Sequence, residues 1–251
     1  MTSDSRAMRS CCSARTRAWL AAHPRVRRAL FVVVGLAVGV AATLGTLELV
    51  FPYPVEKLAL DRSPAVRDCH GEPLRRMLAP GQVWRIVRPL DRIAPAMVEA
   101  TIAAEDRRFR AHGGVDFLAV GRALWLNVTQ WRTVSGASTL TMQLARLVEP
   151  RPRTYWGKLQ EAFRARQIEK ILSKEEILYQ YLNRAPYGGN LSGVEAAARA
   201  YLGKQAADLT LADAALLAGL PQAPSRLRPD RHPDRAVARR RYVLERLHDG
   251  A

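Results

Sequence analysis

The chain has 251 residues, of which 48% are hydrophobic and 25% charged, enough to form a domain with a full core. Its 39 Lys and Arg residues against 23 Asp and Glu give a net charge of +16, which favours anionic partners such as phospholipid headgroups or a phosphorylated substrate. Aromatic residues make up only 7% and do not alternate regularly with basic ones, so nucleic acid is not expected as a partner. Three cysteines, two of them adjacent, exclude a disulfide framework, and no Cys-x-x-Cys pair indicates a zinc site.

One long apolar run lies near the N-terminus. Residues 29–47 carry no charged side chain and would extend roughly 28 Å as a helix, close to the thickness of a bilayer core. Seven arginines and one aspartate precede the run, so the positive-inside rule predicts a basic cytoplasmic tail over 1–28 and an extracytoplasmic location for the residues after the run. We expect an uncleaved transmembrane signal anchor over 29–48. A cleaved signal peptide is the alternative, but residues 48–53 make a poor cleavage site.

The next segment, 49–94, is rich in proline and glycine and predicts a juxtamembrane connector with short strands. Two extended runs, 66–70 and 73–78, flank a turn and predict a small β-hairpin, and 83–87 predict a further strand.

From residue 95 onward the apolar residues recur at helical spacing. The expected helices cover 95–110, 116–130, 138–148, 155–172, 174–184, 193–202, 211–219 and 234–247. Two of the helix starts carry a capping box, Ser173 with Glu176 and Thr210 with Asp213. The final segment, 231–251, predicts a basic C-terminal helix whose arginines form a solvated face.

The first candidate cluster has the sequence EDRRF. On one continuous helix, Ile102, Glu105 and Phe109 would share a face, which surrounds the Glu105 carboxyl with apolar neighbours. Partial burial raises the pKa of a carboxyl group, as a general acid or base requires. His112 would lie near enough to brace Glu105. An exposed Glu105 paired with Arg108 is the alternative.

The second cluster opens a predicted helix. Gly136 permits a tight turn and Ser138 is the expected N-cap, so the free N–H groups at this helix start suit a phosphate. Thr139, Gln143 and Arg146 follow at helical spacing and form a polar stripe. An ordinary capped amphipathic helix explains the same pattern.

The third cluster centres on Glu161, which shares a helix face with apolar residues and therefore faces inward. Three cations are expected around it, namely Arg146, Arg153 and Lys158. Two carboxylates with attendant cations suit displacement at a phosphorylated sugar. One acid transfers the proton, while the cations, or a divalent ion such as Mg²⁺ or Mn²⁺ held by Glu161, stabilise a leaving pyrophosphate. A salt-bridged surface helix is the alternative.

Together these motifs, ED-x-x-F-x-x-H-x-G from Glu105, G-x-STLT-x-Q from Gly136 and K-x-x-E from Lys158, followed by SK-x-EIL-x-x-YLN, resemble the family 51 peptidoglycan glycosyltransferases. These are the glycosyltransferase domains of class A penicillin-binding proteins and their monofunctional relatives. Met142 within the second motif is similar to members of the penicillin-binding protein 1C type. The resemblance implies a mainly α, lysozyme-like helical glycosyltransferase domain over 95–230, after an N-terminal transmembrane helix and a small β-hairpin connector.

The resemblance also implies residue roles. Glu105 matches the acid that deprotonates the acceptor hydroxyl, and Glu161 matches the second acid, near the donor pyrophosphate and its metal. Residues that match the donor site are Ser138, Thr139, Gln143, Arg146, Arg153 and Lys158. Residues that match the shape of the catalytic pocket are Asp106, Phe109 and His112, and Asn183 matches a structural block. No organic cofactor is expected.

The implied function is polymerisation of lipid II into glycan strands at the outer face of the plasma (inner) membrane, with release of undecaprenyl pyrophosphate and inversion at the anomeric carbon. Expected partners are lipid II as donor and acceptor, membrane lipids and other cell-wall synthesis proteins. A lytic muramidase on the same fold and a truncated, non-catalytic anchor are the alternatives. Neither Ser-x-x-Lys nor Lys-Thr-Gly occurs, so no transpeptidase is expected in this chain, which is interpreted as monofunctional or as a truncated bifunctional protein.

Overall fold

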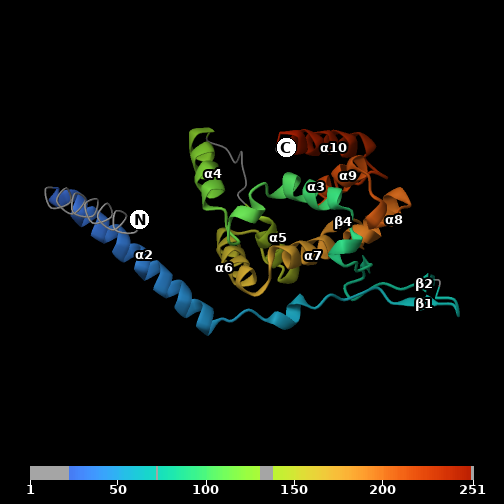
Figure 1. The fold of residues 1–251 in the computed structure, drawn as a ribbon, viewed down its shortest axis with the longest axis horizontal. Coiled ribbons are helices and arrows are strands. Elements are labelled where there is room, and N and C mark those ends of the chain that lie inside the picture. The colour runs from blue at the N-terminus through green and yellow to red at the C-terminus, as the bar shows by residue number, and fades with distance from the viewer. Residues whose placement is uncertain (1–22, 72, 131–137, 250–251) are drawn as a thin grey trace, which may run out of the picture. The chain divides into compact units, whose positions relative to one another are not determined.

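The computed structural model describes residues 23–249 except 72 and 131–137 (Figure 1). The chain divides into two compact units, Met1–Pro52 and Tyr53–Ala251. Most of the expected cytoplasmic tail lies outside the described residues.

The described part of the first unit is a single helix, α2 (Pro24–Val50), with proline in its first turn, where no intrahelical N–H is needed. Its most apolar 18-residue window has a mean hydropathy of 2.3, and none of it is buried. Its two threonines donate their hydroxyl hydrogens to backbone oxygens one turn earlier, Thr43 to Gly39 and Thr46 to Ala42. The helix is long and apolar enough to cross a membrane, as expected for 29–48.

The second unit begins with the connector, which holds the expected hairpin. β1 (Ala65–Arg67) pairs antiparallel with β2 (Pro73–Arg76). β3 (Trp84–Arg85) is shorter than the predicted strand. It pairs in parallel with β5 (Leu191–Ser192), which pairs antiparallel with β4 (Pro186–Gly188). The sequence predicts neither β4 nor β5, because two or three residues are too few to show alternation.

The rest of the unit is helical, as the sequence predicts. The helices are α3 (Pro95–Glu105), α4 (Phe117–Gln130), α5 (Leu140–Val148), α6 (Tyr155–Ile171), α7 (Lys174–Arg184), α8 (Val194–Leu202), α9 (Leu211–Gly219) and α10 (Pro233–His248). Both predicted capping boxes are confirmed, at the starts of α7 and α9. Short 3-10 turns cover Val55–Leu58, Leu90–Arg92, Phe109–Ala111 and Ala206–Asp208.

Asn183 holds the connector against the helices. It is fully buried, its side-chain oxygen accepts the backbone N–H of Arg88, and its amide nitrogen donates to the backbone oxygens of Arg88 and Tyr179. Every polar atom of this buried side chain is therefore satisfied, which supports its expected scaffold role. Arg184 adds to this link by donating to the backbone oxygens of Lys57 and Ala59.

The helix predicted over 95–110 is wrong in its second half. α3 ends at Glu105, and Asp106 has an extended backbone with φ −158°. The backbone leaves the helix here because the Asp106 side chain accepts a hydrogen bond from the backbone of Leu140 in α5. Phe109 is buried in the following 3-10 turn, so it does not share a helical stripe with Glu105.

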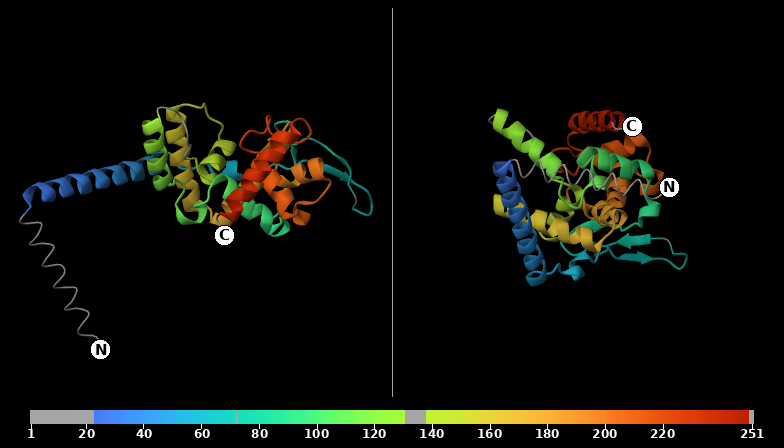
Figure 2. Two further views of the ribbon diagram at one scale, coloured as in Figure 1. Left: turned by 90° about the horizontal axis from the view of Figure 1, so that it is seen from above. Right: turned by 60° about the vertical axis from the view of Figure 1, so that its left-hand side comes forward.

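The C-terminal helix is more than a solvated basic segment. α10 packs against α3 and α9, and the three helices lie side by side in the views of Figures 1 and 2. Ala236 and Val243 on α10 are buried against this surface. One glycine of α9 makes the close approach possible, since a Cβ at Gly219 would lie 2.7 Å from Cγ of Arg239.

Candidate active site

Glu105, the last residue of α3, lies at the centre of the candidate site. Its Oε2 accepts a hydrogen bond of 2.7 Å from Nε2 of Gln143, and the Gln143 oxygen accepts one of 3.2 Å from the buried Tyr181 hydroxyl. Oε1 of Glu105 is buried and has no hydrogen-bond partner. The tyrosine fixes the glutamine, and the glutamine fixes one carboxylate oxygen, so the other is left available.

Burial raises the pKa of Glu105. The hydrogen bond from Gln143 and the charges of Arg239, Arg246 and Arg146 lower it, but they offset the effect of burial only in part. The expected desolvation of Glu105 is thus present, although its cause is tertiary packing and not a helical stripe. Arg108 does not pair with Glu105.

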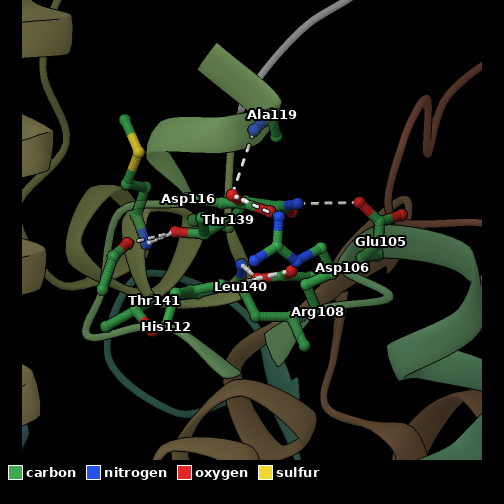
Figure 3. Close-up of polar contacts among 12 residues, drawn as sticks. Glu105, Asp106, Arg108, His112, Asp116, Ala119, Thr139, Leu140 and Thr141 are labelled. Atoms are coloured by element: carbon green, nitrogen blue, oxygen red, sulfur yellow. Dashed lines mark hydrogen bonds and ion pairs between the residues drawn. The ribbon is translucent and has the colours of Figure 1, made fainter. Parts of the chain in front are cut away.

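Asp106 links three segments of the site, as Figure 3 shows. Its Oδ2 accepts the backbone N–H of Leu140, the first residue of α5, at 3.0 Å. Nε2 of His112 lies 3.0 Å from the same oxygen. The expectation that His112 braces Glu105 is wrong, because this ring is bonded to Asp106. A negative charge at the start of α5 is also favoured by the helix dipole.

The start of α5 differs from the expectation by one residue. Thr139, not Ser138, is the N-cap, and its hydroxyl oxygen accepts the N–H of Met142 at 3.1 Å. The same hydroxyl donates to the backbone oxygen of Gly114. Because Asp106 and Thr139 accept the N–H groups of Leu140 and Met142, these two groups are not free to bind a phosphate. Gly136 lies outside the described residues.

Glu161 on α6 is the second buried carboxylate, with 4% of its surface exposed. Nζ of Lys158 donates to its Oε2 at 2.7 Å and to the Ser138 hydroxyl at 2.7 Å. Nη1 of Arg146 lies 3.9 Å from its Oε1. Two of the three expected cations therefore surround Glu161. Arg153 does not, since it is an exposed residue with no ion pair to Glu161 in the described structure.

A cavity of about 490 Å³ adjoins Glu105. The residues lining it that the sequence predicts as site residues are Glu105, Asp106, Ser138 and Thr139. Glu161 does not line it, but its partner Lys158 bonds to Ser138 at the cavity wall. Arg146 acts on both carboxylates, lowering the pKa of Glu105 and approaching Oε1 of Glu161. The charge of Arg146 thus links the two acids.

The remaining walls come from residues that the sequence reasoning missed. Tyr242, Arg246 and Asp249 of the C-terminal segment line the cavity, as do Arg107 and Asp116. Arg108 pairs with Asp116 at 3.4 Å, and not with an exposed Glu105. The density of arginine in α10 was the available signal, but it is equally typical of a solvated face.

Phe109 and Lys174 complete the support behind the site. Phe109 is fully buried, and Nζ of Lys174 lies 4.4 Å from the centre of its ring. Lys174 also donates to the backbone oxygen of His112 and to Glu169. The Thr141 hydroxyl donates to the same Glu169 oxygen, which ties α5 to α6. These contacts hold the 3-10 turn and α5 as one body.

The divalent ion expected at Glu161 stays a prediction. Both oxygens of Glu161 face protein cations, and among the residues described no group of three or more His, Cys, Asp or Glu side chains is arranged to hold a metal.

Comparison with known proteins identifies the family of the chain. Residues 70–248 match the family model described as Transglycosylase. The chain is 49% identical over 197 residues to penicillin-binding protein 1C of Escherichia coli, an alignment that covers 78% of this chain and 25% of that protein. It is 38% identical over 221 residues to penicillin-binding protein 1A of Aquifex aeolicus, with 87% and 30% covered.

A crystal structure of penicillin-binding protein 1A from Haemophilus influenzae aligns with a TM-score of 0.40 and 23% identity, covering 75% of this chain and 18% of that one. The chain spans about a quarter of the length of penicillin-binding protein 1C. The family match covers most of the chain, including every residue that lines the cavity except Asp249. The chain therefore belongs to the transglycosylase family, as its resemblance to the glycosyltransferase domains of penicillin-binding proteins implies.

Proposed function

We propose that this protein is a peptidoglycan glycosyltransferase that polymerises lipid II, with Glu105 as the general base. The observation that carries the proposal is the buried, unpartnered Oε1 of Glu105 beside a cavity large enough for part of a sugar substrate. A carboxylate whose pKa is raised by burial, yet which is fixed through its other oxygen, is suited to accept a proton in a defined direction.

The proposed reaction is a single displacement. Oε1 of Glu105 takes the proton from the 4-hydroxyl of the acceptor GlcNAc, and that oxygen attacks the anomeric carbon of the donor MurNAc. The bond from this carbon to the pyrophosphate oxygen breaks, and undecaprenyl pyrophosphate leaves with the electron pair. Attack from the face opposite to the leaving group inverts the configuration.

Lys158 and Arg146 are proposed to stabilise the negative charge that develops on the leaving pyrophosphate. Both are held near the site by the buried Glu161, which is bonded to Lys158 at 2.7 Å. Glu161 therefore serves to position cations, which is a role that preorganised electrostatic stabilisation requires.

We also propose that α2 anchors the protein and that the second unit acts outside the cytoplasm. The arginines before the apolar run support this orientation through the positive-inside rule. A substrate with a lipid tail of its own is presented at the membrane surface, so an anchored enzyme meets it there.

The test is polymerisation of lipid II by the full chain in detergent, measured as glycan strand formation. We expect Glu105→Gln to lower the rate by about 10²–10⁴-fold, the range for loss of a general base. Glu99→Gln, which changes an exposed acid on the same helix, is the control and should retain activity. Far-UV circular dichroism checks that both variants fold.

Polymerisation at the wild-type rate by Glu105→Gln would exclude Glu105 as the base. Release of soluble muropeptides from purified sacculi, with no strand formation from lipid II, would identify a lytic muramidase instead. No turnover in either assay by the folded wild-type chain would favour a non-catalytic anchor.

A further inference from the structure

The C-terminal helix contributes an arginine to the same cavity as the proposed base. Arg246 lines the cavity together with Glu105, Tyr242 and Asp249. We propose that Arg246 is a positioning residue for the reaction. Its guanidinium, held in the α10 wall of the cavity, favours the ionised state of the Glu105 carboxylate. This inference rests on the proposed role of Glu105.

Tyr242 on α10, itself packed against Arg239, holds this guanidinium in place. Arg239, Tyr242 and Arg246 follow at spacings of three and four residues and so lie along one face of the helix. The guanidinium carbon of Arg239 lies 4.6 Å from the centre of the Tyr242 ring, and that of Arg246 lies 5.6 Å from it. Nη1 of Arg246 donates to the Tyr242 hydroxyl at 2.8 Å. The tyrosine is thus packed against two arginines, which restricts the rotation of Arg246.

The backbone of α10 is tied to the segment that carries the base. Nη2 of Arg107 donates to the backbone oxygen of Arg246 at 2.8 Å and lies 3.8 Å from Asp249. Because Arg107 is only two residues after Glu105, this contact couples the position of α10 to that of the carboxylate. Gly219 of α9 leaves room for the stem of Arg239, the other arginine that contacts Tyr242.

The charge environment of Glu105 gives Arg246 a specific task. Charged and titratable groups that interact electrostatically with Glu105 are Arg239 and Arg246 from α10, Arg146 from α5, Tyr181 from α7 and Tyr187 from β4. Burial raises the pKa of both tyrosines, so they are neutral at physiological pH. The three arginines lower the pKa of Glu105 and so counteract the rise that burial causes.

A through-space charge suits a general base better than a direct ion pair. An arginine bonded to the carboxylate would occupy the oxygen that must take the proton and would weaken it as a base. Oε1 of Glu105 has no partner. Arg246 therefore favours the ionised state of Glu105 while leaving this oxygen free for the acceptor hydroxyl.

The test compares the full chain with its Arg246→Gln variant over a range of pH in lipid II polymerisation. Without the charge, the pKa of Glu105 rises, so the acidic limb of the kcat profile should move to higher pH. On that limb kcat should fall by about three- to tenfold, roughly the effect of half to one pKa unit. At alkaline pH kcat should recover, and KM should not change.

Three further variants separate this role from a structural one. Arg246→Lys keeps the charge and should return the acidic limb towards the wild-type position. Tyr242→Phe removes the acceptor of Nη1 and should shift the limb in the same direction as Arg246→Gln, by less. Arg241→Gln removes an exposed charge from the same helix and should leave the profile unchanged. An unshifted limb in Arg246→Gln, or a rise in KM alone, would overturn the proposal.

A direct titration distinguishes the failure of this inference from failure of the proposed function. The ¹³C carboxyl signal of Glu105, assigned by its loss in Glu105→Gln, reports the pKa of this group without any turnover. A higher pKa in Arg246→Gln than in the wild type supports the role of Arg246 even if Glu105→Gln remains active. An equal pKa in the two proteins refutes it, whatever the activity of Glu105→Gln.

Discussion

The bond between Asp106 and α5 makes a quantitative prediction about stability. Asp106 is buried and accepts hydrogen bonds from the backbone of Leu140 and from His112, each at 3.0 Å. Asp106→Ala leaves both donors unsatisfied in the interior. Each such group costs about 1–3 kcal/mol, so the free energy of unfolding should fall by about 2–6 kcal/mol. For a domain of this size, the melting temperature should then fall by roughly 5–20 °C.

The assay is thermal unfolding of the full chain in detergent at pH 7, followed by circular dichroism, with Asp106→Asn as the matched variant. The asparagine oxygen still accepts the Leu140 N–H, and its amide can donate to Nε2 of His112 in the other tautomer. That tautomer places a hydrogen on Nδ1, a buried atom without a partner, so we expect a loss of about 1–3 kcal/mol. Melting of the Ala variant within about 1 °C of the wild type would refute the reasoning, because it would mean that the buried donors carry no cost.

Three more predictions concern the buried charges and one glycine. Burial raises the pKa of Glu105 in the folded state above its value in the unfolded state, so the folded protein is more stable with this carboxyl protonated. That stability is fully present below the unfolded-state pKa and is lost as pH rises through the folded-state pKa. Glu105→Gln should therefore melt at a higher temperature than the wild type at pH 7, and the difference should vanish below about pH 4. Lys158→Met deprives Glu161 of its 2.7 Å partner and should lower both kcat/KM for lipid II and stability, the latter by about 1–3 kcal/mol in chemical denaturation. Gly114→Ala places a Cβ on a residue with φ +91° and only 2.9 Å from a backbone carbonyl of α6, so chemical denaturation should show a loss of about 1–3 kcal/mol in the free energy of unfolding. Gly113→Ala, whose Cβ would have open space around it, should cost less.

The boundaries of most helices follow from local signals in the sequence. Ser173 and Thr210 open α7 and α9 through capping boxes that involve residues only three positions apart. Such contacts form within one turn, so they are readable from a short window. Glu161 was also predictable, since apolar residues repeat along its face of α6 and leave it directed inward.

The arrangement of the site depends on contacts that no short window contains. α3 ends at Glu105 because Asp106 bonds to Leu140, which is 34 positions further along the chain. His112 is drawn to Asp106 by the same turn, and the sequence alone placed it beside Glu105. The role of α10 depends on packing against α3, which lies more than a hundred residues earlier. Tertiary contacts of this length override local helical preference.

Completion of the cavity by α10 also has a consequence for the order of events during synthesis. The chain is made from its N-terminus, so Glu105 leaves the ribosome more than a hundred residues before Arg246 and the rest of that wall. A nascent chain that has emerged only as far as α9 therefore lacks the wall that Tyr242 and Arg246 contribute. Contacts between such distant segments form late, after the intervening chain has been closed into a loop. The cavity beside Glu105 therefore has all its walls only after α10 has docked on α3 and α9, so a chain that has not yet been made as far as Arg246 has no complete cavity.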